Sequence, residues 1–199
     1  IPTIFHGILT ILGGALNTFL KENAGKVEVK DKLDMCLGAA LGVEYLHLNQ
    51  CMHRDLAARN CLITKDKVVR SEFLHLLNVK ISDFGLSRLG LHYRLKTAMK
   101  LPIKWLAPET ITTFTFSLKT DVFSYGVMVY EIFADGAEPW DGQTNAEVKK
   151  AVCWHTVIEG KCLTFPKCTP EKVKNFFVEN VFTKNPAQRA TMTEVKDYS

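Results

Sequence analysis

Three short motifs rich in polar residues occur in a fixed order in this chain, and the segments around them limit the folds that it can adopt. The motifs are HRDLAARN at 53–60, DFG at 83–85 and APE at 107–109. The runs CLIT (61–64) and VKIS (79–82) follow the first motif and lead into the second, and both have the composition of short strands. The sequence therefore predicts a small β-hairpin that carries polar loops.

The rest of the sequence is mainly helical in pattern. Apolar residues within 30–48 recur at helical spacing, namely Leu33, Cys36, Leu37, Ala40, Leu41 and Val43. Further helical patterns cover 119–134, 144–152, 170–181 and 191–197, whereas glycine and proline break 83–109, which is predicted to be irregular. With 199 residues, of which 47% are hydrophobic, the chain suits one domain with a sizeable core. We therefore expect an α+β fold that is mainly helical.

The overall charge and the cysteine pattern argue against several classes of protein. A net charge of +4 gives no reason to expect binding to nucleic acid. The cysteines include no Cys-x-x-Cys pair, and Cys51 with His53 has no second ligand pair at zinc-finger spacing, so reduced thiols are expected. The apolar run 122–134 is shorter than the ~20 residues of a membrane span. We interpret it as a buried core helix.

The first two motifs hold the groups that phosphoryl transfer requires. Asp55 is a carboxylate that can accept a hydroxyl proton, and Arg59 and Asn60 follow it within the same motif. Asp83 adds a second carboxylate before a flexible glycine. Because Mg²⁺ prefers one or two carboxylate or amide oxygens together with phosphate oxygens, Asn60 and Asp83 form a candidate metal pair.

The set HRDLAARN, DFG and APE, in this order and spacing, resembles the protein kinase family. AAR at 57–59 is similar to tyrosine kinases, because serine/threonine kinases usually have a lysine two residues after the aspartate. LPIKWLAPE at 101–109 also resembles the tyrosine-kinase substrate platform. The resemblance covers 13–199, where GGALNTFLK (13–21) is similar to the helix after the hinge, and the nearest subgroup is the cytoplasmic Fes/Fer-like kinases. It implies a protein kinase-like fold, of which this chain is mainly the helical C-terminal lobe.

The resemblance implies catalytic roles for residues of the first two motifs. Asp55 would orient and deprotonate the substrate tyrosine hydroxyl, and Arg59 would lie near the transferred phosphate in place of the missing lysine. Asn60 and Asp83 would hold Mg²⁺. Leu62 would form the floor of the adenine pocket, with core packing as the alternative explanation. The implied cofactors are therefore ATP and Mg²⁺.

The resemblance also implies a regulatory group and a substrate platform. Tyr93 lies in the segment that the family uses as its activation loop, and its phosphate would contact Arg54 and Arg88. This segment is basic and has no acid between Leu86 and Pro108, its basic residues being Arg88, Arg94, Lys96, Lys100 and Lys104. The substrate platform would comprise Pro102, Lys104 and Trp105.

Further residues are expected to support the site. His53 would pack against Phe84. Asp121, next to the apolar run interpreted above as a buried helix, would steady the backbone of the catalytic loop. Arg189 would pair with Glu109 of the third motif, and a surface salt bridge worth ~0–1 kcal/mol is the alternative.

Parts of the kinase pattern are missing or altered. No G-x-G-x-x-G occurs, and Lys30 in VEVK lies too close to the first motif to be the ATP-binding lysine. A first residue other than methionine also suggests a fragment. We therefore interpret 1–199 as a partial kinase domain, in which 1–12 is a remnant of the N-terminal lobe or hinge. The segments 70–78 and 153–156 resemble insertions, which either bind a partner or are retained non-coding sequence in a faulty gene model.

The function that this resemblance implies is that of a non-receptor-type protein tyrosine kinase. Such a protein transfers the γ-phosphoryl group of ATP to tyrosines of proteins in intracellular signalling, and we expect impaired activity in this chain. The implied partners are protein substrates bearing tyrosine, together with SH2-containing or other signalling domains of the full-length protein, but no nucleic acid. The implied location is cytoplasmic, without a membrane span and peripheral at the membrane in the full-length protein. The alternative is a non-catalytic kinase-like binding module or a faulty gene-model fragment.

Overall fold

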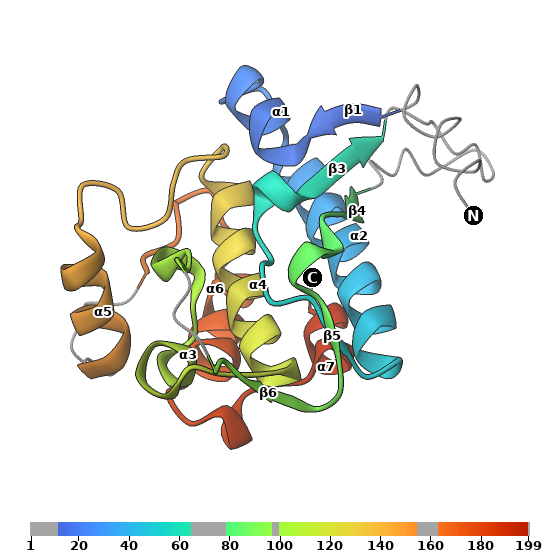
Figure 1. Cartoon of the computed structure of the whole chain (residues 1–199). Helices are drawn as coiled ribbons and strands as arrows, with labels where there is room; N and C mark the ends of the chain where they lie inside the picture. Colours follow the sequence, from blue (N-terminus) through green and yellow to red (C-terminus); the bar gives the residue numbers. More distant parts are fainter. Residues whose placement is uncertain (1–11, 65–78, 97–99, 155–162, 199) are drawn as a thin grey trace.

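The computed structural model describes residues 12–64, 79–96, 100–154 and 163–198 (Figure 1). Helices predominate in these residues, with small antiparallel sheets beside them, and the expected α+β fold is confirmed. The α-helices are α1 (Leu16–Glu22), α2 (Val29–Leu48), α3 (Pro108–Thr113), α4 (Leu118–Phe133), α5 (Asn145–Trp154), α6 (Glu171–Phe176) and α7 (Met192–Lys196). The strands are β1 (Leu12–Ala15), β2 (Cys51–Met52), β3 (Cys61–Thr64), β4 (Val79–Ile81), β5 (Arg88–Leu89), β6 (His92–Arg94) and β7 (Thr115–Ser117). Short helical turns are η1 (Ala58–Asn60), η2 (Phe84–Leu86), η3 (Ile103–Trp105), η5 (Phe177–Val181) and η6 (Pro186–Gln188).

Helix α4 runs through the centre of the molecule, with α2 on one side and α5 on the other (Figure 1). Val122, Tyr125 and Val127 lie on different sides of this helix, and all three are buried. A helix that is apolar all round belongs in a core rather than at a surface. Helix α4 is therefore the buried core helix that was predicted from the apolar run 122–134.

Two acids of α4 are buried along with its apolar residues. Asp121 is 1% exposed and Glu131 is 3% exposed. Asp121 lies in the first turn of the helix, whose start is fixed by a capping box between Ser117 and Thr120. Because a buried carboxylate without partners is costly, both acids need hydrogen-bond donors. Those donors belong to the site described below.

Helix α2 forms a second wall of the core. Cys36, Ala40 and Val43 of the predicted stripe are buried, and the hydroxyl of Tyr125 donates to the carbonyl oxygen of Cys36 at 2.8 Å. Leu41 was predicted in the same stripe, but it is 49% exposed. The stripe is narrower than predicted because α4, α7 and β4 cover only part of the circumference of α2.

A three-stranded antiparallel sheet in the order β1-β3-β4 joins the first two motifs. CLIT forms β3 and VKI forms β4, with Cys61 opposite Ile81, so the predicted hairpin is confirmed. The predicted helix at 13–21 is wrong for its first residues, because β1 pairs with β3 and α1 begins only at Leu16. Within β1, Gly14 has a φ of 92°, which suits glycine but not a helix.

Two short ladders tether the segment between the second and third motifs. Strand β5 pairs with β2, with Leu89 opposite Cys51, and β6 pairs with β7, with Tyr93 opposite Phe116. These ladders were not predicted, since strands of two or three residues leave no period to detect.

The C-terminal part contributes Phe177, Val181 and Val195 to the main core. The predicted helix at 170–181 is α6 followed by the π-helical turn η5, which buries Phe177 against the ring of Tyr125. The predicted insertion at 70–78 lies outside the described residues. Of 153–156, only Cys153 and Trp154 are described, and they end α5.

In the part of the chain that the structure describes, no helix combines the length and apolar character needed to cross a bilayer. The cysteines described there have free thiols, namely Cys36, Cys51, Cys61, Cys153 and Cys168. Burial raises the pKa of the Cys36 and Cys61 thiols, which keeps both of them protonated.

Candidate active site

The backbone of the HRDLAARN loop is held by Asp121 of α4. Its Oδ2 accepts from the backbone N–H of His53 at 2.7 Å, and its Oδ1 accepts from the backbone N–H of Arg54 at 2.9 Å. His47 of α2 also lies 3.2 Å from Oδ2 through Nε2. Arg54 has a φ of 74°, a conformation that costs a non-glycine residue about 1–2 kcal/mol. The two hydrogen bonds to Asp121 offset this strain and fix the loop on the core.

Both carboxylate oxygens of Asp55 are engaged within the loop. Nη2 of Arg59 lies 2.5 Å from Oδ1, and Nδ2 of Asn60 donates to Oδ2 at 2.8 Å. The same Nδ2 donates to the backbone oxygen of Asp55 at 2.8 Å. Charge-assisted bonds of this kind are stronger than neutral ones, so the direction of the Asp55 carboxylate is well defined.

The loop is joined to the DFG motif by hydrogen bonds and a ring contact. The backbone N–H and the hydroxyl of Ser82 donate to the backbone oxygen of Asn60 at 2.9 and 2.8 Å. The His53 ring lies edge-on to Phe84, with 5.3 Å between ring centroids. Its Nε2 lies 2.9 Å from the backbone oxygen of Ser82, and its Nδ1 lies 3.3 Å from the backbone nitrogen of Asp55. The neutral tautomer with hydrogen on Nε2 satisfies both contacts.

Asn60 and Asp83 each have a side-chain oxygen of the kind that divalent cations such as Mg²⁺ prefer. Because Nδ2 of Asn60 faces Asp55, its amide oxygen is the remaining donor atom of that side chain. Asp83 is exposed in a left-handed conformation with a φ of 58°, and one carboxylate oxygen accepts from Gly85 N–H at 3.3 Å. Among the described residues, no group of three or more His, Cys, Asp and Glu side chains could hold a metal. A cation here would therefore take further ligands from phosphate and water, as Mg²⁺ commonly does.

Leu62 lies in the middle of β3, half-buried between Ala15 of β1 and Lys80 of β4. The structure thus places it in the sheet beside the loop, and not in the main core. Its predicted role under adenine stays a prediction.

Arg54 and Tyr93 are brought together beneath the loop. The guanidinium of Arg54 lies between two rings, 4.4 Å from the Tyr93 centroid and 4.5 Å from the Phe116 centroid. Its Nη1 donates to the backbone oxygen of Leu86 at 2.9 Å. Burial lowers the pKa of Arg54, and the nearby Tyr93 opposes this shift. Arg88 lies farther from the Tyr93 ring, at 6.0 Å.

The predicted substrate platform lies against α4. Pro102 precedes η3, which contains Lys104 and Trp105. The indole Nε1 of Trp105 donates to Oε2 of Glu131 at 2.9 Å, and the guanidinium of Arg59 lies 4.5 Å from the Trp105 ring centroid. Lys104 is 3.4 Å from Glu138. Arg59 thus joins the platform to Asp55.

Glu131 was not among the predicted site residues. Its Oε2 also accepts from the backbone N–H of Ala58 in the loop, at 2.9 Å. Burial raises the pKa of this carboxyl, and the hydrogen bonds from Ala58 and Trp105 oppose the shift. An acid inside an apolar helical run was the one sequence signal that could have identified it.

Glu109 and Arg189 form a bidentate pair at the base of the platform. Nη1 and Nη2 of Arg189 lie 2.8 and 3.2 Å from the two carboxylate oxygens of Glu109. The Arg189 side chain is fully buried and also donates to the backbone oxygens of Lys119 and Thr183. The structure therefore excludes the alternative of an exposed salt bridge.

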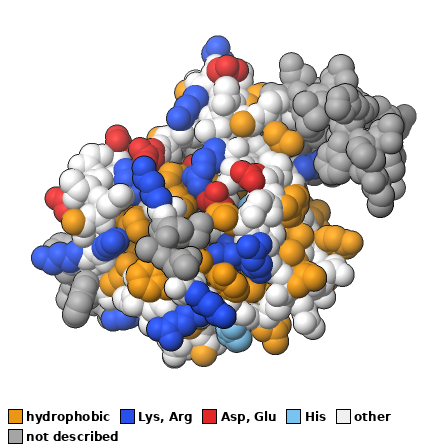
Figure 2. All heavy atoms as spheres, in the orientation of Figure 1, with side chains coloured by type: hydrophobic (Ala, Val, Ile, Leu, Met, Phe, Trp, Pro, Cys, Tyr) orange, Lys and Arg blue, Asp and Glu red, His pale blue; other side chains and the backbone are white. Residues whose placement is uncertain are grey.

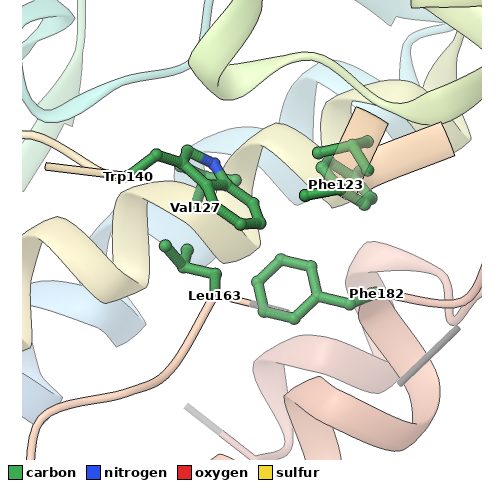
Figure 3. Close-up of a pocket in the computed structure, with 7 residues that line it drawn as sticks. Phe123, Val127, Trp140, Leu163 and Phe182 are labelled. Carbon is green, nitrogen blue, oxygen red and sulfur yellow. The ribbon is translucent and has the colours of Figure 1, made fainter. Parts of the chain in front are cut away.

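The surface of this face is mixed in charge. Figure 2 shows acidic side chains near its middle beside Lys and Arg side chains, with further Lys and Arg below them. A separate apolar cavity lies under the platform, where Phe123, Val127, Trp140, Leu163 and Phe182 point toward one another (Figure 3). The described residues that line this cavity include no acid, base or metal ligand.

Comparison with known proteins identifies one matching family and several similar proteins. Residues 8–198 match the family described as protein tyrosine and serine/threonine kinase. Fer-related kinase 1 of Caenorhabditis elegans is 37% identical over 182 residues, which are 92% of this chain and 43% of that protein. Human tyrosine-protein kinase TXK is 35% identical over 184 residues, which are 92% of this chain and 32% of that protein. Human tyrosine-protein kinase Fer is 32% identical over 188 residues, which are 94% of this chain and 21% of that protein. The chain spans less than half the length of each of these relatives.

Proposed function

The chain belongs to the protein tyrosine and serine/threonine kinase family, and from this premise we propose that the protein transfers the γ-phosphoryl group of ATP to tyrosine side chains of proteins. Members of this family use ATP and a divalent metal ion. The observation that carries the proposal is the Asp55 carboxylate, held on one oxygen by Arg59 and on the other by Asn60. A base that is fixed in direction before substrate binds is what proton abstraction from a hydroxyl requires.

In this proposal Asp55 is the general base. It accepts the proton of the substrate hydroxyl as the hydroxyl oxygen forms its bond to the γ-phosphorus, and the bond from that phosphorus to the ADP oxygen breaks. Arg59 keeps the carboxylate in place and puts positive charge near the transferred group. Asp121 and the ring of His53 keep the loop backbone and the DFG segment in register with Asp55.

We assign Asn60 and Asp83 as the residues that would hold Mg²⁺. When bound, Mg·ATP supplies the phosphoryl group and the charge that stabilises its transfer. On the protein side, the hydrogen bonds from Ser82 to the backbone oxygen of Asn60 join the two segments that carry these residues. We place Leu62 under the adenine ring. The sequence has no G-x-G-x-x-G, so the groups that cover the phosphates would have to come from outside these 199 residues.

The tyrosine class of substrate is supported by the platform. Arg59 replaces the lysine of serine/threonine kinases, and it lies on the ring of Trp105 rather than in free solvent. The relatives TXK and Fer are both named tyrosine-protein kinases. We propose that Pro102, Lys104 and Trp105 receive the segment that follows the acceptor tyrosine.

The wider setting is also a proposal. We infer that 1–199 is part of a catalytic domain of a cytoplasmic protein in signalling, whose remaining length holds SH2 or other signalling domains. This inference is supported by the relatives, because this chain matches only 43% of Fer-related kinase 1 and 21% of Fer, and the rest of each relative lies outside the match. In the same interpretation, 70–78 is retained non-coding sequence or the product of a faulty gene model, and the alternative is a partner-binding insertion.

A peptide assay on the full-length protein that contains this chain tests the proposal. We expect transfer of labelled phosphate to a peptide with a single tyrosine, and at least tenfold slower transfer to the same peptide with serine. Asp55→Asn should reduce kcat by about 10²–10⁴-fold, the usual contribution of a general base. Glu22→Gln, on the exposed side of α1, is the matched control and should retain activity. Transfer to neither peptide would support the non-catalytic binding module instead.

A further inference from the structure

A single carboxylate oxygen on the core helix joins two separate parts of the site. Oε2 of Glu131 accepts from the backbone N–H of Ala58 and from the indole Nε1–H of Trp105, each at 2.9 Å. Ala58 belongs to the catalytic loop and Trp105 to the substrate platform. Because both donors end on one atom, the position of Glu131 sets the distance between loop and platform.

Arg59 occupies the space between these two parts. Its guanidinium lies 4.5 Å from the centroid of the Trp105 ring, and its Nη2 lies 2.5 Å from Oδ1 of Asp55. A continuous series of contacts therefore leads from Glu131 to the base, through the indole and the guanidinium. Each contact depends on direction, since a cation prefers the face of an indole and a guanidinium pairs with carboxylate in one plane.

The electrostatics of Glu131 suit an acceptor and not a reacting group. It is 3% exposed, and burial raises its pKa while its two hydrogen bonds and the charge of Arg59 oppose the shift. The backbone N–H of Ala58 and the indole N–H of Trp105 both donate to Oε2, so this oxygen acts as a hydrogen-bond acceptor. Because this acid is buried, we expect it to act through its neighbours and not by contact with substrate.

We propose that Glu131 is a positioning residue of the phosphoryl-transfer site, which orients Asp55 through Trp105 and Arg59. This inference rests on the proposed function, in which Asp55 is the base. Without the acceptor at Glu131, the Trp105 indole loses the bond that fixes its rotation. Arg59 then loses the ring face beneath it, and the Asp55 carboxylate gains freedom to turn away from the substrate.

Kinetics of variants of the full-length protein separate this role from a merely structural one. Glu131→Leu should lower kcat about 10–100-fold with little change in KM for ATP, since small misplacements of a reacting group cost about this much. Glu131→Gln keeps an oxygen acceptor at the same place and should restore most of kcat. Trp105→Phe removes the indole N–H together with the five-membered ring but keeps an aromatic ring under Arg59, so we expect a folded protein with a smaller loss of kcat than Glu131→Leu.

A double-mutant cycle identifies the route of the effect. If Glu131 acts through Arg59, then Glu131→Leu should change kcat less than threefold in an Arg59→Ala background, because coupled residues are not additive. Equal losses in both backgrounds would overturn the proposal. Tyr125→Phe is the matched control, because it removes a buried hydrogen bond of α4 on the side of α2 and should leave kcat unchanged.

A structural readout keeps the proposal testable even if the protein transfers no phosphate. In spectra of nitrogen-15-labelled protein, the Trp105 indole signal is identified by its loss in Trp105→Phe. Glu131→Leu should shift this signal and also broaden or shift the Arg59 guanidinium signals. A shift of the indole alone, with Arg59 unchanged, would show that Glu131 has no influence on the base. Absence of phosphate transfer by the wild type, together with both shifts, would refute the proposed function but not the positioning.

Discussion

Arg189 and Glu109 lie 80 positions apart in the sequence, and the fold joins them as a bidentate ion pair with the arginine fully buried. Loss of one partner of such a pair leaves an uncompensated charge in the core, which typically costs 3–5 kcal/mol. We expect Glu109→Gln to lower the free energy of unfolding of the chain by about 3 kcal/mol, measured by urea denaturation.

An exposed pair provides the control for this prediction. Glu171 and Lys174 are neighbours on α6 at 3.6 Å, with most of Glu171 in solvent. Glu171→Gln should change the free energy of unfolding by less than about 0.5 kcal/mol. A Glu109→Gln chain as stable as this control would mean that Arg189 is satisfied by its carbonyl partners alone.

Gly136 follows α4 at a place where there is no room for a side chain. Its φ is +77°, and a Cβ there would lie 2.7 Å from the backbone oxygen of Asn17. Gly142 has nearly the same φ, +73°, but an added Cβ there would have no atom within 4 Å. Both alanine variants should show backbone strain of about 1–2 kcal/mol. Gly136→Ala should lose about 1–3 kcal/mol more in thermal or urea unfolding, because backbone must move. Equal losses at the two positions would show that strain alone matters.

The pair of Glu44 and Lys196 joins α2 to α7 at 2.9 Å and should make stability depend on pH. The hydrogen bond from Lys196 is the main cause that lowers the pKa of Glu44 in the folded chain. A carboxyl with a lowered folded pKa adds stability above its ordinary pKa, and this stability is lost as pH falls through the folded value. The difference in unfolding free energy between wild type and Glu44→Gln should therefore be present at neutral pH and vanish once the pH has fallen well below the lowered pKa of Glu44. A difference that persists there would exclude ionisation as its source.

Nucleotide binding by the 199-residue chain should be weak. The proposed metal ligands Asn60 and Asp83 are present, but there is no G-x-G-x-x-G to donate hydrogen bonds to the phosphates. In calorimetry with Mg·ATP we expect a dissociation constant of about 1 mM or weaker. Micromolar binding that is lost in Asp83→Asn would sink this prediction.

Phosphorylation of Tyr93 should raise the activity of the full-length protein. The Tyr93 ring already lies at 4.4 Å from the Arg54 guanidinium and 6.0 Å from that of Arg88. A phosphate on the hydroxyl would bring about −1.5 to −2 of charge and three acceptor oxygens to these two cations. Tyr93→Phe should cost most of the turnover, and Arg54→Ala should abolish the response to phosphorylation.

The control for this experiment is Tyr45→Phe, since Tyr45 lies 68% exposed on α2, away from the loop. It should phosphorylate peptide at the parental rate. A Tyr93→Phe protein that is equally fast would show that Tyr93 is not the switch.

Much of the fold was predictable because its signals are local. The period of apolar residues predicted α2 and α4, and the short runs around the motifs predicted β3 and β4. Periodicity does not say how much of a helix is covered, and so Leu41 was wrongly assigned to the core. The short ladders β2–β5 and β6–β7 depend on which segments meet in space.

The candidate site shows the same division. Asp55, Asn60 and Asp83 could be named from the sequence because their motifs carry the donor atoms in a fixed order. Glu131 could not, since its partners Ala58 and Trp105 come from other parts of the chain. The sequence indicates which chemical groups are available, whereas the fold determines which donors meet at the same acceptor atom.

The two buried acids of α4 have a consequence for the motion of the catalytic loop. The amides of His53 and Arg54 end on Asp121, and the amide of Ala58 ends on Glu131. Surface loops usually exchange their amide hydrogens with deuterium within a short time, because their opening needs no disturbance of the core. Here these three amides are bonded to buried carboxylates of α4, so we expect their exchange to be as slow as that of the most buried elements of the chain. The HRDLAARN loop, although it connects secondary-structure elements, would then be as long-lived as the most buried helix.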